Sequence, residues 1–317
     1  MLFRSVGRFA YDAAGNQLGD GLRSFACDAE NRHSKTVISD SDEGSKESYL
    51  FNALGQRVFK SDAQVDHTAP SQAALGSDFI TWLQSNFAWL FGSSSNSTAT
   101  LGTHFNYADP SPNVGAASTL PAWALLGEYG NGGNITTAPT EYIWMPTEDN
   151  TPILVAFYRA GRLYSVHTDH LGTPRVIRDD SNQVVWQLPF SPFGEIKPSG
   201  PLQSVSTTVN GSAQTQIRAT QPAITFNLRY PGQYFDSESN LNYNFFRTYS
   251  PNGGRYTQAD PIGLDGGWNR FGYVGGNPLS NSDPLGLLWV YQQSSGNMYQ
   301  QGNNPGSSTL VLGMPGR

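Results

Sequence analysis

The stretch FAYDAAGNQL at Phe9–Leu18 decides the fold, because two related stretches follow it. They are FACDAENRHS at Phe25–Ser34 and YLFNALGQRV at Tyr49–Val58. In each copy an aromatic residue precedes an Asp or Asn, and a Gly or Asn follows a few positions later. The Asp or Asn side chain can accept hydrogen bonds from its own turn, and Gly or Asn tolerates the left-handed backbone that completes it. The pattern predicts repeated β-hairpins, which need neighbours in a sheet to bury their apolar faces.

The composition agrees with a β-rich protein and limits its partners. The chain of 317 residues has 34 Gly, 20 Pro, 12% aromatic and only 14% charged residues, which favours an all-β fold with many reversals. The net charge of −6 gives no basis for binding nucleic acid or an anionic membrane, so neither is expected as a partner. The single cysteine, Cys27, excludes an intramolecular disulfide and a multi-cysteine metal site, and we expect it to pack in a strand.

The sequence divides into four predicted segments. Residues 1–62 contain the degenerate repeats, and residues 63–139 form an insertion rich in low-complexity loops such as GSSSNSTATLGT. Strand patterns resume over residues 140–287, where RAGRLY and DDSNQVV indicate hairpin turns. Residues 288–317 form a tail rich in Gln, Asn and Gly that is too short to fold independently.

One helix is predicted, inside the insertion. The apolar positions of DFITWLQSNFAWLFG, at Asp78–Gly92, recur with helical spacing. The stretch is too short and too polar to span a bilayer. We therefore favour an amphipathic helix packed on a protein surface over membrane contact.

Two longer stretches carry a resemblance to a known family. LYSVHTDHLGTPRVIRDDSNQVVWQLPFSPFGE at Leu163–Glu195 and YPGQYFDSESNLNYNFFRTYSPNGGRYTQADPIGL at Tyr230–Leu264 resemble the RHS repeat-associated core domain. YDAAGNQL and CDAENR look like degenerate YD repeats of the same family. Its members include the C component of insecticidal toxin complexes, RHS effectors of type VI secretion and, more distantly, the teneurin shell. The resemblance covers residues 140–287 closely and residues 9–60 more loosely.

The resemblance implies a fold, partners and a location. The family forms a β-cocoon, a shell built from a strip of YD hairpins and closed by the core domain. We therefore expect an all-β chain: a curved, open antiparallel strip that ends in the core domain, with one inserted helix. Implied partners are the rest of an RHS shell, a toxin-complex or type VI secretion component, and an immunity protein. The implied source is bacterial, with synthesis in the cytoplasm and specialised secretion, since MLFRSVGRFAYDAAGNQ lacks the apolar core of a Sec signal.

A doubled motif supplies the candidate catalytic site. Asp-Pro-x-Gly-Leu occurs at Asp260–Leu264 and again at Asp283–Leu287. In the polymorphic toxins the core domain is an aspartic self-protease, so the resemblance implies that Asp260 and Asp283 are catalytic. It also assigns a role to Arg247 and places the cut at the Leu287–Leu288 bond. No cofactor or metal is expected.

The chemistry requires two carboxylates so close that they cannot both ionise. One then keeps a proton near neutral pH while the other acts as base, and a neighbouring Arg can separate the two roles. The alternative is structural, because Asp, Pro and Gly at these positions also suit a type I turn. Both interpretations stay open: a self-cleaving peptidase, or a non-enzymatic scaffold or binding fragment whose motifs are only turns.

Other candidates are weaker. His167, Asp169 and His170 are of metal-ligand type. On a strand, however, His167 and His170 point to opposite faces and no further ligand is apparent, so we favour a packing role. Several aromatic residues could form a sugar platform but are expected in the sheet and core: Tyr129, Tyr142, Tyr158, Tyr164, Trp144, Trp186 and Trp268.

The repeat count and the tail imply an incomplete toxin. Only three or four repeats are recognisable, so we expect the chain not to close a shell by itself. The tail 288–317 corresponds to a truncated toxin segment. It contains neither Cys nor His, and no toxin enzyme activity is expected from it.

Overall fold

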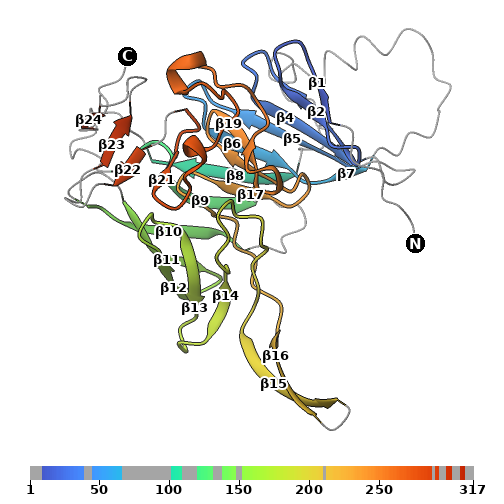
Figure 1. Ribbon diagram of the computed structural model, residues 1–317, viewed down its shortest axis with the longest axis vertical. Coiled ribbons are helices and arrows are strands. Elements are labelled where there is room, and N and C mark those ends of the chain that lie inside the picture. Colours follow the sequence, from blue (N-terminus) through green and yellow to red (C-terminus); the bar gives the residue numbers. More distant parts are fainter. Residues whose placement is uncertain are drawn as a thin grey trace, which may run out of the picture.

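The structure is a computed structural model in which the fold is all-β (Figure 1). It describes the following residues: 9–38, 45–65, 101–108, 120–130, 138–147, 152–209, 212–287, 290–292, 298–301 and 308–310.

A 14-stranded antiparallel sheet forms the body of the molecule, and its strands follow one another in chain order. Its strands are β1 (Ala10–Tyr11), β2 (Gln17–Gly19), β3 (Arg23–Cys27), β4 (His33–Ile38), β5 (Ser45–Phe51), β6 (Arg57–Ser61), β8 (Gly102–Tyr107), β9 (Leu125–Gly130), β10 (Thr140–Met145), β11 (Ile153–Arg159), β12 (Arg162–Thr168), β13 (Pro174–Arg178) and β14 (Val184–Gln187), with β7 (Gln64–Val65) beside β5. The sheet curves, and within the described residues β1 and β14 stay at opposite ends of the strip (Figure 1). The predicted open antiparallel strip is confirmed.

One kind of turn occurs five times between neighbouring strands in the described part of the sheet. In the first copy the Asp12 carboxylate accepts hydrogen bonds from the backbone N–H of Ala14 (2.9 Å) and of Asn16 (2.8 Å), and Gly15 takes a φ of 88°. The same side-chain acceptor recurs at Asp28, Asn52, Asp169 and Asp179. The left-handed position is filled in turn by Asn31, Gly55, Gly172 and Asn182. Since only Gly and Asn adopt this φ at little cost, the repeat motif is a hairpin turn, as predicted.

A four-stranded sheet packs on one face of the long sheet. It comprises β17 (Tyr234–Asp236), β18 (Leu241–Asn244), β19 (Arg247–Ser250) and β20 (Arg255–Tyr256). Tyr234 and Tyr243 from this sheet join Phe105, Phe157 and Trp186 of the long sheet in one buried apolar cluster. The cluster fixes the small sheet against the strip, so the segments that follow it are also held in place.

A buried charge network adds a second connection between the two sheets. Arg57 at the start of β6 donates from Nη1 to Asp236 Oδ2 at 2.6 Å, and Lys60 Nζ lies 2.8 Å from Glu238 Oε2. The guanidinium of Arg57 also lies over four rings, at 4.5 to 5.3 Å from the centroids of Tyr49, Phe105, Tyr234 and Tyr243. Two cations face two carboxylates, so the network is balanced in charge.

Two smaller sheets complete the described chain. Strands β15 (Leu202–Val209) and β16 (Ser212–Ala219) pair over eight positions and project from the body as an isolated arm (Figure 1). Strand β21 (Asn281–Ser282) pairs with β22 (Val290–Gln292), which continues through β23 (Met298–Gln301) and β24 (Ser308–Leu310). Along the chain, three short 3-10 helices lie between β19 and β21: η2 (Pro251–Gly253), η3 (Gly263–Gly266) and η4 (Val274–Gly276).

The predicted insertion 63–139 differs from the structure in one respect. Strands β8 and β9 fall within it and pair with β6 and β10, so part of this range continues the sheet instead of interrupting it. The sequence on either side of these two short strands is of low complexity, so no strand pattern was recognised there. The predicted helix at Asp78–Gly92 lies outside the described residues. Within the described ranges, no helix is long and apolar enough to cross a membrane.

Candidate functional site

Three segments of the last third of the fold bring the predicted residues together. Arg247 opens β19, Asp260 follows β20, and Asp283 directly follows β21. Each Asp begins a turn: Gly263 N–H donates to the Asp260 carbonyl at 3.0 Å, and Gly286 N–H donates to the Asp283 carbonyl at 3.3 Å. Both Asp-Pro motifs are therefore turns, and this geometry agrees with both interpretations of the motif.

Arg247 connects the two carboxylates. Its Nη2 lies 3.0 Å from Asp260 Oδ2 and 3.2 Å from Asp283 Oδ2, and all three side chains are 2% exposed. Its other donors bind backbone, with Nε on the Gly286 carbonyl (2.5 Å) and Nη1 on the Arg270 carbonyl (3.1 Å). The guanidinium is therefore held on every side, and a single nitrogen serves both carboxylates.

The predicted scissile residue lies against the same nitrogen. Arg247 Nη2 is 3.3 Å from the carbonyl oxygen of Leu287, and the Leu287 N–H donates to Asp283 Oδ1 at 3.0 Å. Leu288 lies outside the described residues. A guanidinium donor that reaches a peptide carbonyl polarises it and can stabilise negative charge that develops on the oxygen.

Burial and charge act against each other at this site. Burial raises the pKa of Asp260 above its usual value, while Arg247 opposes the rise. Burial likewise raises the pKa of Asp283, and Arg247 again acts in the opposite direction. Arg270 also faces Asp260, but its side chain is exposed and its charge is solvated. One buried cation for two buried carboxylates favours a state in which a single proton stays on the pair.

Comparisons with known proteins agree with the motifs. No family model matches the chain. The double-stranded DNA deaminase toxin A of Burkholderia cenocepacia is 35% identical over 133 residues, which cover 42% of this chain and 8% of that protein. The probable deoxyribonuclease RhsB of Dickeya dadantii is 38% identical over 117 residues, which cover 37% of this chain and 7% of that protein. This chain thus spans less than a tenth of the length of these two relatives.

A solved structure supports the same assignment at the level of the fold. The crystal structure of TcdB2-TccC3 matches 87% of this chain and 11% of its own chain with a TM-score of 0.53 and 18% identity. The chain is similar in sequence and in fold to RHS/YD-repeat polymorphic toxins. It has the fold of a portion of that complex.

Three further residues at this site were not predicted from the sequence: Tyr256, Asn244 and Gly266. Tyr256 donates from its hydroxyl to Asp283 Oδ2 at 2.7 Å, and Asn244 Nδ2 donates both to that hydroxyl (2.8 Å) and to the Asp283 carbonyl (2.9 Å). A Cβ added at Gly266 would lie 2.2 Å from Asp260 Oδ2 and 3.2 Å from the Leu287 carbonyl oxygen. No sequence signal distinguishes this Tyr, Asn or Gly from the many others in the chain.

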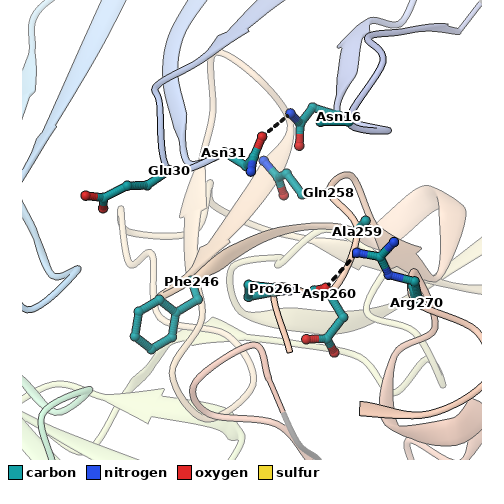
Figure 2. A pocket seen from close by; sticks show the side chains of 10 residues that line it. Asn16, Glu30, Asn31, Phe246, Gln258, Ala259, Asp260, Pro261 and Arg270 are labelled. Atoms are coloured by element: carbon teal, nitrogen blue, oxygen red, sulfur yellow. Dashed lines mark hydrogen bonds between the residues drawn. The ribbon is translucent and has the colours of Figure 1, made fainter. Parts of the chain in front are cut away.

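A cavity of about 220 Å³ adjoins the site on the side of the repeats (Figure 2). Its lining comes from the first two repeat turns, from the segment around the first Asp-Pro motif, and from Phe246 and Arg270: Ala14, Asn16, Glu30, Asn31, Phe246, Gln258, Ala259, Asp260, Pro261 and Arg270. Figure 2 shows Arg270 reaching the backbone of Asp260, where Nη2 donates to the carbonyl at 3.1 Å. The first two repeat turns and the first Asp-Pro turn are therefore direct neighbours.

The residues that were considered as metal ligands or as a reactive thiol have structural contacts instead. Asp169 closes its own turn and pairs with Arg175 at 2.8 Å, and His170 Nε2 donates to the Leu279 carbonyl at 2.9 Å. In the part of the chain that the structure describes, no group of three His, Cys, Asp or Glu side chains is arranged to hold a metal ion. Burial raises the pKa of Cys27, at the end of β3, to about 11, which disfavours the reactive thiolate.

The aromatic residues that were considered as a sugar platform are dispersed. Tyr142 and Trp186 belong to the buried core, Trp144 packs edge-on against Trp123, and Trp268 is 94% exposed on the loop after η3. A sugar platform would require these rings on one open face. Their separate environments agree instead with the expected packing role for the core members.

Proposed function

We propose that this chain is the C-terminal shell and self-processing portion of an RHS polymorphic toxin, and that it cuts its own chain after Leu287. The observation that supports the proposal is the shared position of Arg247 Nη2, which lies within 3.3 Å of both carboxylates and of the Leu287 carbonyl oxygen. A pair of scaffolding turns requires neither the second carboxylate nor the peptide carbonyl at this nitrogen.

The reaction is the hydrolysis of one peptide bond. The ionised carboxylate takes a proton from a water molecule, whose oxygen attacks the carbonyl carbon of Leu287. Arg247 Nη2 stabilises the negative charge on the Leu287 oxygen. The protonated carboxyl of the pair gives its proton to the amide nitrogen of Leu288 as the C–N bond breaks. The products are a carboxyl group on Leu287 and an amine on Leu288, and the pair still holds one proton.

The remaining parts of the proposal concern the assembled toxin. The segment 288–317 is the part of this sequence that such a cut would release. The chain completes a larger RHS shell with a partner component, and the assembled protein leaves a bacterial cell through a specialised secretion system. The names of its relatives, a deaminase toxin and a deoxyribonuclease, describe those proteins, and their activities are not assigned to this chain.

An intact-mass measurement tests the cut. The chain of residues 1–317 is expressed, and circular dichroism verifies that it is folded. Its intact mass is then measured by mass spectrometry. We expect two species, with the masses of residues 1–287 and 288–317. Asp260→Asn and Asp283→Asn should both give one full-length species. Asp179→Asn, which alters a repeat turn far from the site along the chain, is the matched control and should be cut like the parent.

Two results contradict the proposal. A folded parent protein that stays full length favours the scaffold interpretation, in which both Asp-Pro motifs are only turns. Fragments whose masses correspond to breakage at Asp260–Pro261 or Asp283–Pro284 would show acid-labile bond breakage instead of cleavage after Leu287.

A further inference from the structure

The hydroxyl of Tyr256 makes a contact at the site that the proposed reaction does not yet use. The side chain is 1% exposed, and the hydroxyl lies 2.7 Å from Asp283 Oδ2. Its ring supports the guanidinium of Arg247, whose Cζ is 3.6 Å from the ring centroid. The residue therefore contacts one carboxylate directly and the shared cation through its aromatic face.

The direction of the hydroxyl hydrogen bond is fixed by Asn244. Its Nδ2 lies 2.8 Å from the Tyr256 hydroxyl and 2.9 Å from the carbonyl oxygen of Asp283. A carbonyl can only accept, so the amide nitrogen, not the amide oxygen, must face both groups. The hydroxyl receives a hydrogen bond from Asn244 and must use its own proton toward Asp283.

The two carboxylates consequently receive different numbers of donors. Asp283 accepts from Tyr256, from Arg247 Nη2 and from the Leu287 N–H. Asp260 forms an ion pair with Arg247 Nη2 at 3.0 Å and accepts a hydrogen bond from the Ile262 N–H at 3.1 Å. Hydrogen bonds from donors stabilise the ionised form of a carboxyl group, so the negative charge is favoured on Asp283 and the proton on Asp260.

The other groups around the pair do not reverse this preference. Burial raises the pKa of Tyr273 well above its usual value, so that this neighbour of Asp283 stays neutral. Burial and the charge of Asp283 do the same for Tyr256. Arg247 serves both carboxylates, and Arg270 binds the Asp260 backbone from an exposed position.

We propose that Tyr256 is a positioning residue that sets the order of protonation in the pair, so that Asp283 is the base and Asp260 the acid of the self-cleavage. This inference rests on the proposed function and assigns its two roles. The close approach of the Gly266 backbone agrees with the assignment, because the position of an added Cβ lies near both Asp260 Oδ2 and the Leu287 oxygen. Asp260 Oδ2 and the Leu287 carbonyl oxygen therefore both lie near Gly266.

The test is the pH dependence of cleavage in Tyr256→Phe, which keeps the ring against Arg247 and removes only the hydroxyl. The full chain is made by cell-free synthesis, pulse-labelled, and shifted into buffers of different pH, and the cut is followed on gels. We expect cleavage to slow by at least tenfold. We also expect the acidic limb of the pH profile to move up by about one unit, because Asp283 loses a donor to its ionised form.

Tyr249→Phe is the matched control. Tyr249 is 0% exposed and belongs to the same aromatic cluster, but its hydroxyl donates to the Phe193 carbonyl at 2.8 Å. This variant should keep the parent rate and pH profile. If Tyr256→Phe does not fold, Asn244→Ala provides the second test, because the hydroxyl then loses the donor that orients it. The acidic limb should move in the same direction with a smaller loss of rate.

The outcomes separate the two proposals. A folded parent chain that is not cut overturns the proposed function and this inference with it. A parent that is cut, together with Tyr256→Phe at the parent rate and profile, overturns only the inference. A slower variant with an unchanged profile assigns Tyr256 a purely structural role and also overturns it. A shift of the basic limb instead of the acidic limb would give Asp283 and Asp260 the opposite roles.

Discussion

Two buried arginines in this molecule differ in the charges that surround them. Arg57, in the long sheet, shares its surroundings with Lys60, and the two cations face the carboxylates of Asp236 and Glu238. Arg247 faces two carboxylates as the single buried cation at its site. Both guanidinium side chains are 2% exposed, so burial alone does not distinguish them.

The difference lies in what the remaining donors do. Around Arg57 four aromatic rings enclose the guanidinium, and its Nε and Nη2 have no hydrogen-bond partner. Around Arg247 the donors all meet carbonyl or carboxylate oxygens, one of which belongs to Leu287. A balanced charge cluster in an aromatic cage holds two sheets together. In the proposed reaction, the unbalanced cluster keeps one proton on the carboxylate pair beside a peptide bond.

The largest expected effect follows from removing the cation of the balanced cluster. Arg57→Met leaves Asp236 buried with only Lys60 at 3.4 Å, and should lower the free energy of unfolding by about 3 to 5 kcal/mol. Urea unfolding in the uncut Asp260→Asn background measures it. Arg178→Met, which removes one exposed hydrogen bond to the Asn182 carbonyl, is the control and should change stability by about 0.5 kcal/mol or less. Equal effects for both variants would remove the structural role assigned to Arg57.

The next effect concerns the unbalanced cluster. Arg247→Lys keeps the charge but cannot serve two carboxylates and three carbonyls at once, so cleavage should slow about a hundredfold or more. The rate is measured by the pulse-labelled assay, and stability is measured in the Asp260→Asn background. A lysine variant that cuts at the parent rate would show that only the positive charge matters, not the geometry of the fork.

A third effect comes from His33, which lies beside the balanced cluster. Burial lowers the pKa of His33 from 6.5 to about 4, with Glu238 and Arg57 as opposing neighbouring charges. The unfolded chain therefore binds this proton first, and stability should fall as the pH drops from 6.5 toward 4. The loss should be about 2 kcal/mol by pH 5.

Urea unfolding at pH 7 and pH 5 measures this loss, and His33→Gln is the comparison. The raised pKa values of Asp260 and Asp283 act in the opposite direction, since their stability contribution falls as pH rises. The difference between parent and His33→Gln isolates the histidine. An identical pH dependence in both proteins would contradict the assignment.

The smallest effect tests the space around the carboxylate pair. In Gly266→Ala the new Cβ would lie 2.2 Å from Asp260 Oδ2, so the carboxylate must move, and cleavage should slow about tenfold. Gly130→Ala is the control, because a Cβ there meets nothing within 4 Å and the backbone is not left-handed. A Gly266→Ala protein that is cut at the parent rate would show that the loop can shift without affecting the site.

The sequence predicted the parts of this molecule that depend on local chemistry. The turn at Asp12 follows from residues within five positions of one another, and the same rule recurs through Asp179, so the antiparallel strip was predictable. The proximity of Arg247, Asp260 and Asp283 was expected only from the family resemblance. The contacts of Tyr256 and Gly266 depend on how the segments around β20 and η3 pack, and strands β8 and β9 depend on neighbours far along the chain. None of these leaves a local pattern.

The order of the strands also has a consequence for how the molecule folds. Consecutive strands pair along almost the whole strip, so most of the sheet can form from short-range contacts as the chain emerges. Tyr49 and Glu238, by contrast, are 189 positions apart, and their contact closes a very long loop. Docking of the small sheet is thus the slow, non-local event. The contact between Arg247 and Asp283 spans only 36 positions, so it does not depend on closing that long loop.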